Sequence, residues 1–116
     1  MHEDHIHRIL IVEDDALLGL LLEGFVEELG YRVNGPYLNL KDGLVHATKD
    51  DIDFALLDFD LGQGTTALPI AQVLTRRGIS FVFTTATPPE HIRRFLPTAT
   101  ILRKPVSPAA LAQLLS

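Results

Sequence analysis

The sequence predicts an α/β fold, a doubly wound parallel sheet with helices on both faces. Two observations carry this prediction. Short apolar runs of strand length alternate with longer stretches of helical pattern along the 116 residues. This alternation repeats five times, and strand–helix–strand units of this kind form parallel sheets with right-handed crossovers. The length suits one domain with its own core.

Each predicted element follows from its apolar pattern and its punctuating residues. The predicted strands are 8–12, 32–35, 53–58, 80–84 and 100–103, with Pro36 stopping the second strand. The predicted helices are 16–29, 40–49, 65–77, 88–96 and 108–115. Asp15, Asn39, Thr87 and Ser107 are the predicted N-caps of four of them, and Thr65 or Thr66 begins the third. Gly30 and Gly78 end two helices.

Five strands in this alternation predict the flavodoxin-like (βα)5 arrangement with strand order 2-1-3-4-5. In such a sheet the first and third strands are neighbours, and the chain reverses direction of winding between them. Ligands bind beyond the carboxyl ends of the strands at this point. We therefore expect a site where the first and third strands end.

Composition excludes several classes of protein. No apolar run reaches the roughly 18 residues that would cross a bilayer, and there is no cysteine for disulfides or thiolate metal sites. A net charge of −5 argues against direct nucleic-acid binding. We expect a cytoplasmic protein with no membrane partner, with residues 1–7 as a flexible N-terminal segment. The histidines there, His2, His5 and His7, favour a frayed terminus over a metal site.

Acidic side chains follow the two neighbouring strands. Glu13 and Asp14 come directly after the first strand, and Asp58 ends the third. Together these carboxylates would repel each other and raise each other's pKa values. Mg²⁺ prefers a few carboxylates with water and phosphate oxygens, so it would resolve the repulsion. The alternative is a set of solvated strand ends, which we favour only for Asp15.

A hydroxyl and a cation are expected beside the acids. Thr85 follows the fourth strand and Lys104 follows the fifth. Phosphoryl transfer depends mostly on positioning and charge stabilisation, and a carboxylate, a divalent cation and a lysine supply these. The pattern therefore indicates a phosphoryl-accepting site.

At this point the sequence resembles the receiver domain of bacterial two-component response regulators, of the CheY-like single-domain type. The matching segments are ILIVEDD at 9–15, ALLDFDLGQG at 55–64, FVFTTA at 81–86 and ILRKPVS at 101–107. The resemblance covers nearly the whole chain and makes residues 8–116 a receiver domain. It implies a signalling domain in a phosphorelay, not a turnover enzyme.

The resemblance also implies a role for each site residue. Asp58 would be the phosphoacceptor and would take the group from a phosphohistidine. Asp14 would bind Mg²⁺ directly, Glu13 through water, and Asp60 through its backbone carbonyl. Thr85 would be the switch hydroxyl, Lys104 would pair with a phosphoryl oxygen, and the bond from Lys104 to Pro105 would be cis.

The sequence departs from the family at the positions that read out activation. Ile101 stands where an aromatic residue is frequent, three residues before the lysine. Val106 replaces a frequent phenylalanine, and Thr87 replaces the aromatic residue of a subgroup with a similar fourth strand. These departures put a Tyr/Phe switch coupled to Thr85 in doubt.

The first helix carries more leucine than a single buried face needs. Leu17, Leu18 and Leu21 are candidates for the surface that meets the phosphodonor, a sensor histidine kinase or a histidine phosphotransfer protein. The alternative is a wide buried face. Arg93 and Arg94 are possible docking residues, and a homodimer is possible.

Two other functions stay open at this stage. Asp58 and Asp60 resemble the paired aspartates of haloacid-dehalogenase-type phosphatases, although Gly62 stands where that family favours Thr or Val. A receiver that is never phosphorylated would act only as a binding module.

Overall fold

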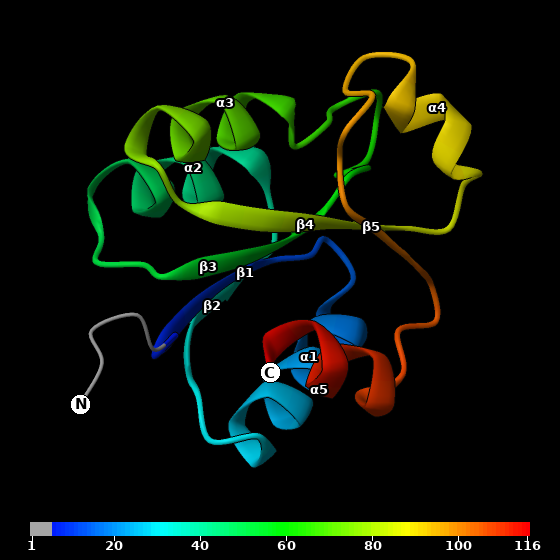
Figure 1. Ribbon diagram of the computed structural model, residues 1–116. Coiled ribbons are helices and arrows are strands. Elements are labelled where there is room, and N and C mark those ends of the chain that lie inside the picture. The colour runs from blue at the N-terminus through cyan, green and yellow to red at the C-terminus, as the bar shows by residue number, and fades with distance from the viewer. Residues whose placement is uncertain (1–5) are drawn as a thin grey trace.

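The computed structural model describes residues 6–116, and it forms one parallel sheet between two layers of helices (Figure 1). The strands are β1 (Arg8–Val12), β2 (Arg32–Tyr37), β3 (Phe54–Asp58), β4 (Ser80–Thr85) and β5 (Ile101–Arg103). The helices are α1 (Ala16–Glu28), α2 (Leu40–Lys49), α3 (Leu68–Arg77), α4 (Pro89–Arg93) and α5 (Pro108–Leu115). The strand order β2-β1-β3-β4-β5 confirms the predicted flavodoxin-like topology.

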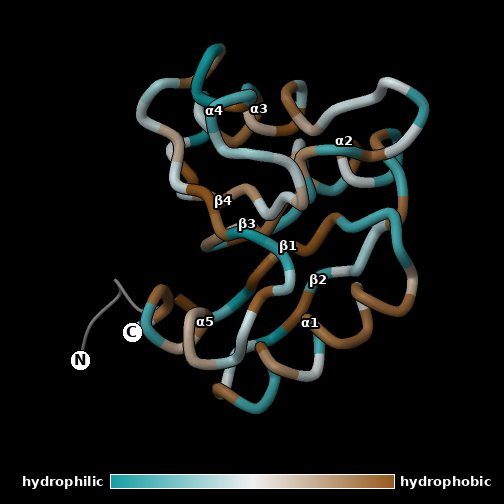
Figure 2. Tube along the Cα trace, turned by 90° about the vertical axis from the view of Figure 1, so that its right-hand side faces the viewer, coloured by the Kyte–Doolittle hydropathy of each residue, from teal (hydrophilic) through white to brown (hydrophobic). Residues whose placement is uncertain are grey.

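Two hydrophobic cores lie on opposite faces of the sheet. Helices α1 and α5 cover one face, and α2, α3 and α4 lie on the other (Figure 1). Alternate residues of β1 supply both cores, since Ile9 and Ile11 face one helix layer while Leu10 and Val12 face the other. The tube view shows the same division, with hydrophobic residues running through the central strands (Figure 2). Within residues 6–116, none of the helices has the length and apolar character to cross a bilayer.

The predicted end of β2 at Pro36 is wrong, because the strand continues to Tyr37. Leu10 pairs with Asn34 and Val12 with Tyr37, so two residues of β2 lie opposite one residue of β1. A bulge on an edge strand tolerates proline, which has no N–H to donate. The carbonyl of Tyr37 then accepts a hydrogen bond from the N–H of Glu13, at 2.9 Å. The bulged strand therefore fixes the residue that follows β1.

Two predicted helix starts are also wrong. Helix α3 begins at Leu68, because the preceding residues pair with the loop after β3: the N–H of Ala67 donates to the carbonyl of Phe59 at 2.9 Å. Helix α4 begins at Pro89 without a side-chain cap, because the hydroxyl of Thr87 is engaged with Thr85. The predicted caps Asp15, Asn39 and Ser107 each accept backbone N–H groups as expected.

Helix α4 is shorter than predicted and ends at Arg93. Ile92 is buried in the core, whereas the side chain of Phe95 is 64% exposed. Phe95 does not share the buried position of Ile92, because the helix ends before it. The predicted flexible segment 1–7 lies mostly outside the described residues, together with His2 and His5.

Two glycines offer a test of how closely the helices pack. A Cβ at Gly43 of α2 would lie 2.9 Å from Cγ2 of Val12, whereas a Cβ at Gly24 of α1 would have no such neighbour within 4 Å. We expect Gly43→Ala to lower the free energy of unfolding by about 1–3 kcal/mol through overpacking. Gly24→Ala should raise it by about 0.5–1 kcal/mol, because alanine favours the helix.

Urea denaturation of both variants checks this pair. Equal effects of the two substitutions would contradict the difference in packing.

Candidate functional site

The carboxyl ends of β1 and β3 bring the predicted acids together. Val12 pairs with Leu57, so the residues that follow, Glu13 and Asp58, lie side by side at the same edge of the sheet. Carboxylate oxygens of Glu13, Asp14 and Asp58 all lie within 4.8 Å of one another. Glu13 and Asp58 are buried and Asp14 is exposed, so the group has one open side.

Lys104 joins these acids from the end of β5. Its Nζ lies 2.9 Å from Oε1 of Glu13 and 3.2 Å from Oδ2 of Asp58. Its backbone N–H donates to the carbonyl of Thr85 at 2.8 Å, which fixes the start of the side chain. The bond from Lys104 to Pro105 is cis, which confirms the expectation from the resemblance.

Thr85 lies at the end of β4, as predicted, and is buried. Its hydroxyl oxygen accepts a hydrogen bond from the N–H of Thr87 at 3.0 Å and lies 2.8 Å from the hydroxyl oxygen of Thr87. This contact of Thr87 was not predicted from the sequence, where Thr87 was a helix cap and a replacement for an aromatic residue. A threonine two residues after the predicted switch hydroxyl was the signal available.

The loop after β3 passes beside the acids. The side chain of Asp60 is exposed, and its backbone pairs with Thr66. Gly62 has a φ of +92°, and a Cβ there would lie 3.5 Å from Oδ2 of Asp14. Glycine in this loop therefore leaves room next to the exposed carboxylate of the group.

The surroundings of the site shift the pKa values of Asp58 and Lys104. Burial raises the pKa of Asp58 to about 8, with further increases from Asp14 and Glu13 and an opposing effect of Lys104. Burial lowers the pKa of Lys104, but its contacts with Glu13 and Asp58 outweigh this and raise the pKa above its usual value. Without an added cation, Asp58 therefore holds a proton at neutral pH.

The residues present suit a magnesium ion. Two buried carboxylates and one exposed carboxylate supply hard oxygen donors, and the open side leaves space for water or phosphate oxygens. Burial and the neighbouring carboxylates of Asp14 and Glu13 raise the pKa of Asp58, and a bound cation would oppose this increase. Glu13, Asp14 and Asp58 are the residues that could hold the ion.

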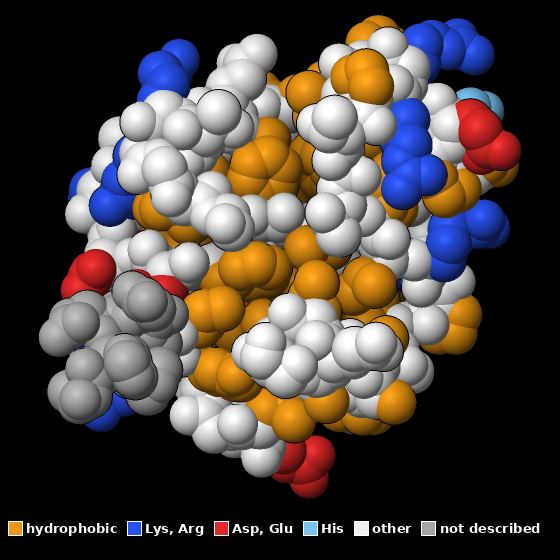
Figure 3. Space-filling view, viewed as in Figure 1, with side chains coloured by type: hydrophobic (Ala, Val, Ile, Leu, Met, Phe, Trp, Pro, Cys, Tyr) orange, Lys and Arg blue, Asp and Glu red, His pale blue; other side chains and the backbone are white. Residues whose placement is uncertain are grey.

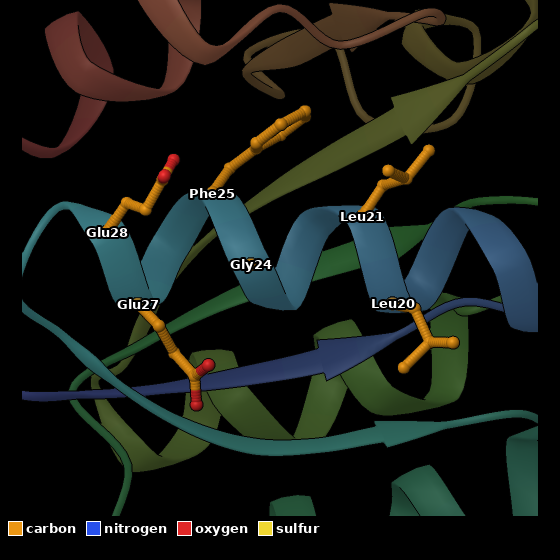
Figure 4. Close-up of a pocket in the computed structure, with 6 residues that line it drawn as sticks. All are labelled: Leu20, Leu21, Gly24, Phe25, Glu27 and Glu28. Atoms are coloured by element: carbon orange, nitrogen blue, oxygen red, sulfur yellow. The ribbon is translucent and has the colours of Figure 1, made fainter.

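The leucines of α1 are divided between core and surface. Leu22 is buried, but Leu17 is 67% and Leu21 is 47% exposed, and Leu18 is half-buried. The alternative of a wide buried face is therefore wrong for Leu17 and Leu21. Figure 4 shows Leu21 and Phe25 extending from one side of α1, and Leu20 and Glu27 from the other.

A cavity of about 500 Å³ connects this helix with the acidic site. Leu18, Leu21 and Phe25 line it on one side, and Lys104 and Val106 line it on the other. Figure 3 shows hydrophobic side chains gathered between the two helix layers, with basic side chains near α4, where Arg93 and Arg94 are exposed. An apolar surface therefore lies beside half-buried Lys104.

Several solved structures share the fold of this chain over nearly its whole length. The BeF3-activated conformation of SdrG from Pseudomonas melonis Fr1 is 33% identical over 97% of this chain and 98% of that chain, with a TM-score of 0.79. SdrG from Sphingomonas melonis Fr1 is 32% identical over 95% of this chain and 93% of that chain, with a TM-score of 0.78. A CheY-like response regulator receiver domain protein from Methanospirillum hungatei JF-1 shares the fold at 23% identity, covering 95% and 90% of the two chains, with a TM-score of 0.81.

Sequence comparison alone finds less. No protein-family model matches the chain, and no curated protein matches its sequence.

The raised pKa of Asp58 predicts an inverse dependence of stability on pH. The folded protein binds a proton on Asp58 up to about pH 8, whereas the unfolded chain releases it near pH 4. In chelator-containing buffer the free energy of unfolding should therefore fall by about 1 kcal/mol per unit as pH rises from 6 to 8. Asp50 has a lowered pKa, so its contribution to the stability of the fold is lost only at more acidic pH.

Asp58→Asn is the matched control, because it keeps the shape and removes the titration. We expect the difference in unfolding free energy between variant and wild type to widen toward pH 8, in favour of the variant. Denaturation at several pH values measures this, and parallel profiles would contradict it.

Proposed function

The chain belongs to the CheY-like receiver domains of response regulators, and we propose that it accepts a phosphoryl group on Asp58 from a partner phosphohistidine. The observation that carries this proposal is the position of the Asp58 carboxylate. It is buried, lies 3.2 Å from the Nζ of Lys104, and shares its edge of the sheet with two further carboxylates. A carboxylate that forms a covalent phosphoryl intermediate needs this kind of fixed position beside a cation.

The transfer forms one bond and breaks another. An oxygen of the Asp58 carboxylate attacks phosphorus, the bond from phosphorus to the histidine nitrogen breaks, and the imidazole leaves with the electron pair. Lys104 would offset the negative charge of the phosphoryl oxygens, and Thr85, which follows the residue paired with Asp58 on β4, would supply a hydroxyl after side-chain rotation. Asp58 must be ionised to attack, so its neighbours govern its reactivity.

Mg²⁺ bound by Asp58, Asp14 and, through water, Glu13 would supply the positive charge that keeps Asp58 ionised and balances the phosphoryl oxygens. The backbone carbonyl of Asp60 is a further proposed ligand. The protein residues then have distinct tasks. Asp58 would react with the phosphoryl group, and Glu13 and Asp14 would hold the cation. Lys104 is paired with Glu13 at 2.9 Å.

The proposed partner is a sensor histidine kinase or a histidine phosphotransfer protein that docks on α1. Leu18 and Leu21 line a cavity that reaches Lys104, and Leu17 is exposed on the same helix. An apolar helix face so close to the nucleophile suits a partner that must bring its histidine to Asp58. We propose that the domain signals through changed partner contacts.

Phosphorylation can be tested directly by intact mass. After incubation with acetyl phosphate and Mg²⁺, we expect the wild type to gain one phosphoryl group, and Asp58→Asn to gain none. Asp60→Asn is the matched control: it keeps the backbone carbonyl, so phosphorylation should persist.

The same experiment separates the alternatives. Multiple turnover of phosphate monoesters that is lost in Asp60→Asn would favour a phosphatase. No mass gain from acetyl phosphate or from a histidine kinase would favour an unphosphorylated binding module.

The proposed docking surface on α1 predicts that a substitution there affects phosphorylation by a kinase but not by acetyl phosphate. Leu21→Gln should slow transfer from a phosphorylated sensor kinase about tenfold, because buried leucines contribute about 1–2 kcal/mol to an interface. Phosphorylation by acetyl phosphate should be unchanged. Leu20→Gln, on the other side of α1, is the control, and an equal loss in both variants would argue against this surface.

A further inference from the structure

The hydroxyl of Thr85 is already occupied. Thr85 is 1% exposed, so water does not compete for this group. Within residues 6–116, its hydroxyl oxygen is hydrogen-bonded only to Thr87, through the N–H at 3.0 Å and the hydroxyl at 2.8 Å. A threonine hydroxyl has one proton to donate, so donating it to another acceptor excludes donation to the hydroxyl of Thr87, and turning the side chain away breaks both contacts.

The backbone around Thr85 is fixed on both sides. The carbonyl of Thr85 accepts the N–H of Lys104 at 2.8 Å, and the carbonyl of Thr84 accepts the N–H of Phe59 at 2.9 Å. The strand end is thus tied to both neighbouring strands of the site. Reorientation of the hydroxyl requires a change of side-chain rotamer, not a shift of β4.

The loop after β4 depends on the same contacts. Pro88 and Pro89 follow Thr87, and neither has an N–H to donate. Helix α4 has no side-chain cap at its start. The pair of hydrogen bonds between Thr87 and Thr85 therefore anchors this loop to the end of the sheet.

We propose that Thr87 is a positioning residue that holds the Thr85 hydroxyl away from Asp58 until a phosphoryl group competes for it. This inference rests on the proposed function. When the hydroxyl donates to a phosphoryl oxygen, its contacts with Thr87 are lost and the loop before α4 is released. Thr87 thereby sets the free-energy cost of activation and passes the event to α4.

The neighbouring residues agree with this route. Ile101 pairs with Phe83 in the sheet and packs against the core. As an isoleucine it has no aromatic ring that could turn inward on activation. Beyond the loop, α4 is held by buried Ile92, and Phe95 lies exposed at its end. Release at Thr87 changes the support of a short helix that is followed by an exposed apolar ring.

The test uses beryllofluoride as a phosphoryl mimic, titrated with Mg²⁺ into the full chain and followed by amide NMR shifts. Thr87→Val removes the hydroxyl and keeps the backbone N–H and the side-chain shape. We expect beryllofluoride to bind this variant about fivefold more tightly than wild type, the effect of one hydrogen bond lost from the unliganded state. In wild type, exchange of the Thr87 amide with water should become faster on binding.

A double-mutant cycle separates this role from a general effect on folding. In the Thr85→Val background, Thr87→Val should change beryllofluoride affinity less than twofold, because no hydroxyl remains to be held. Equal or weaker binding by Thr87→Val, or the same gain in the Thr85→Val background, would overturn the inference and leave the proposed function intact. Failure of wild type to bind beryllofluoride would overturn both.

Discussion

The ion pairs of Lys104 allow two carboxylates to be buried at one edge of the sheet. Glu13 is fully buried and Asp58 nearly so, and unpaired charges in such positions are costly. The Nζ of Lys104 lies within 3.2 Å of both. Lys104 supplies one positive charge for two carboxylates, and burial, together with Asp14 and Glu13, raises the pKa of Asp58. The site is consequently built with a deficit of positive charge, which a metal ion or a phosphoryl transfer with its cation would relieve.

Backbone hydrogen bonds extend from the sheet into the site and position its side chains. The N–H of Glu13 donates to Tyr37, that of Phe59 to Thr84, and that of Lys104 to Thr85. Each bond joins the residue after one strand to a neighbouring strand. Hydrogen bonding of the parallel sheet therefore continues beyond its regular strands. These bonds fix the backbone on which the side chains of the site are carried. Rotation of side chains, such as that of Thr85, is the motion that these bonds leave free.

Sequence reasoning predicted the parts of the structure that depend on periodicity and on strand order. The apolar runs and their alternation with helices gave the topology, and the topology placed Glu13 and Asp14 beside Asp58. It failed where tertiary contacts override local preference. The hydroxyl of Thr87 bonds Thr85 instead of capping α4, the bulge carries β2 past Pro36, and the early end of α4 exposes Phe95. The apolar pattern does not encode these features. The bulge depends on pairing with β1, which is distant in sequence, and the choice between two local hydroxyl contacts of Thr87 depends on the path of the loop after β4.

The bulge in β2 has a consequence for behaviour at high concentration. An open parallel sheet has two edges, and exposed edges recruit strands from other molecules and seed aggregation. Here β2 contains a bulge and Pro36, which has no N–H to donate, and β5 at the opposite edge has only three residues. Both edges are thus poor templates for another strand. The domain can expose apolar surface on α1 for a partner without offering its sheet to further copies of itself.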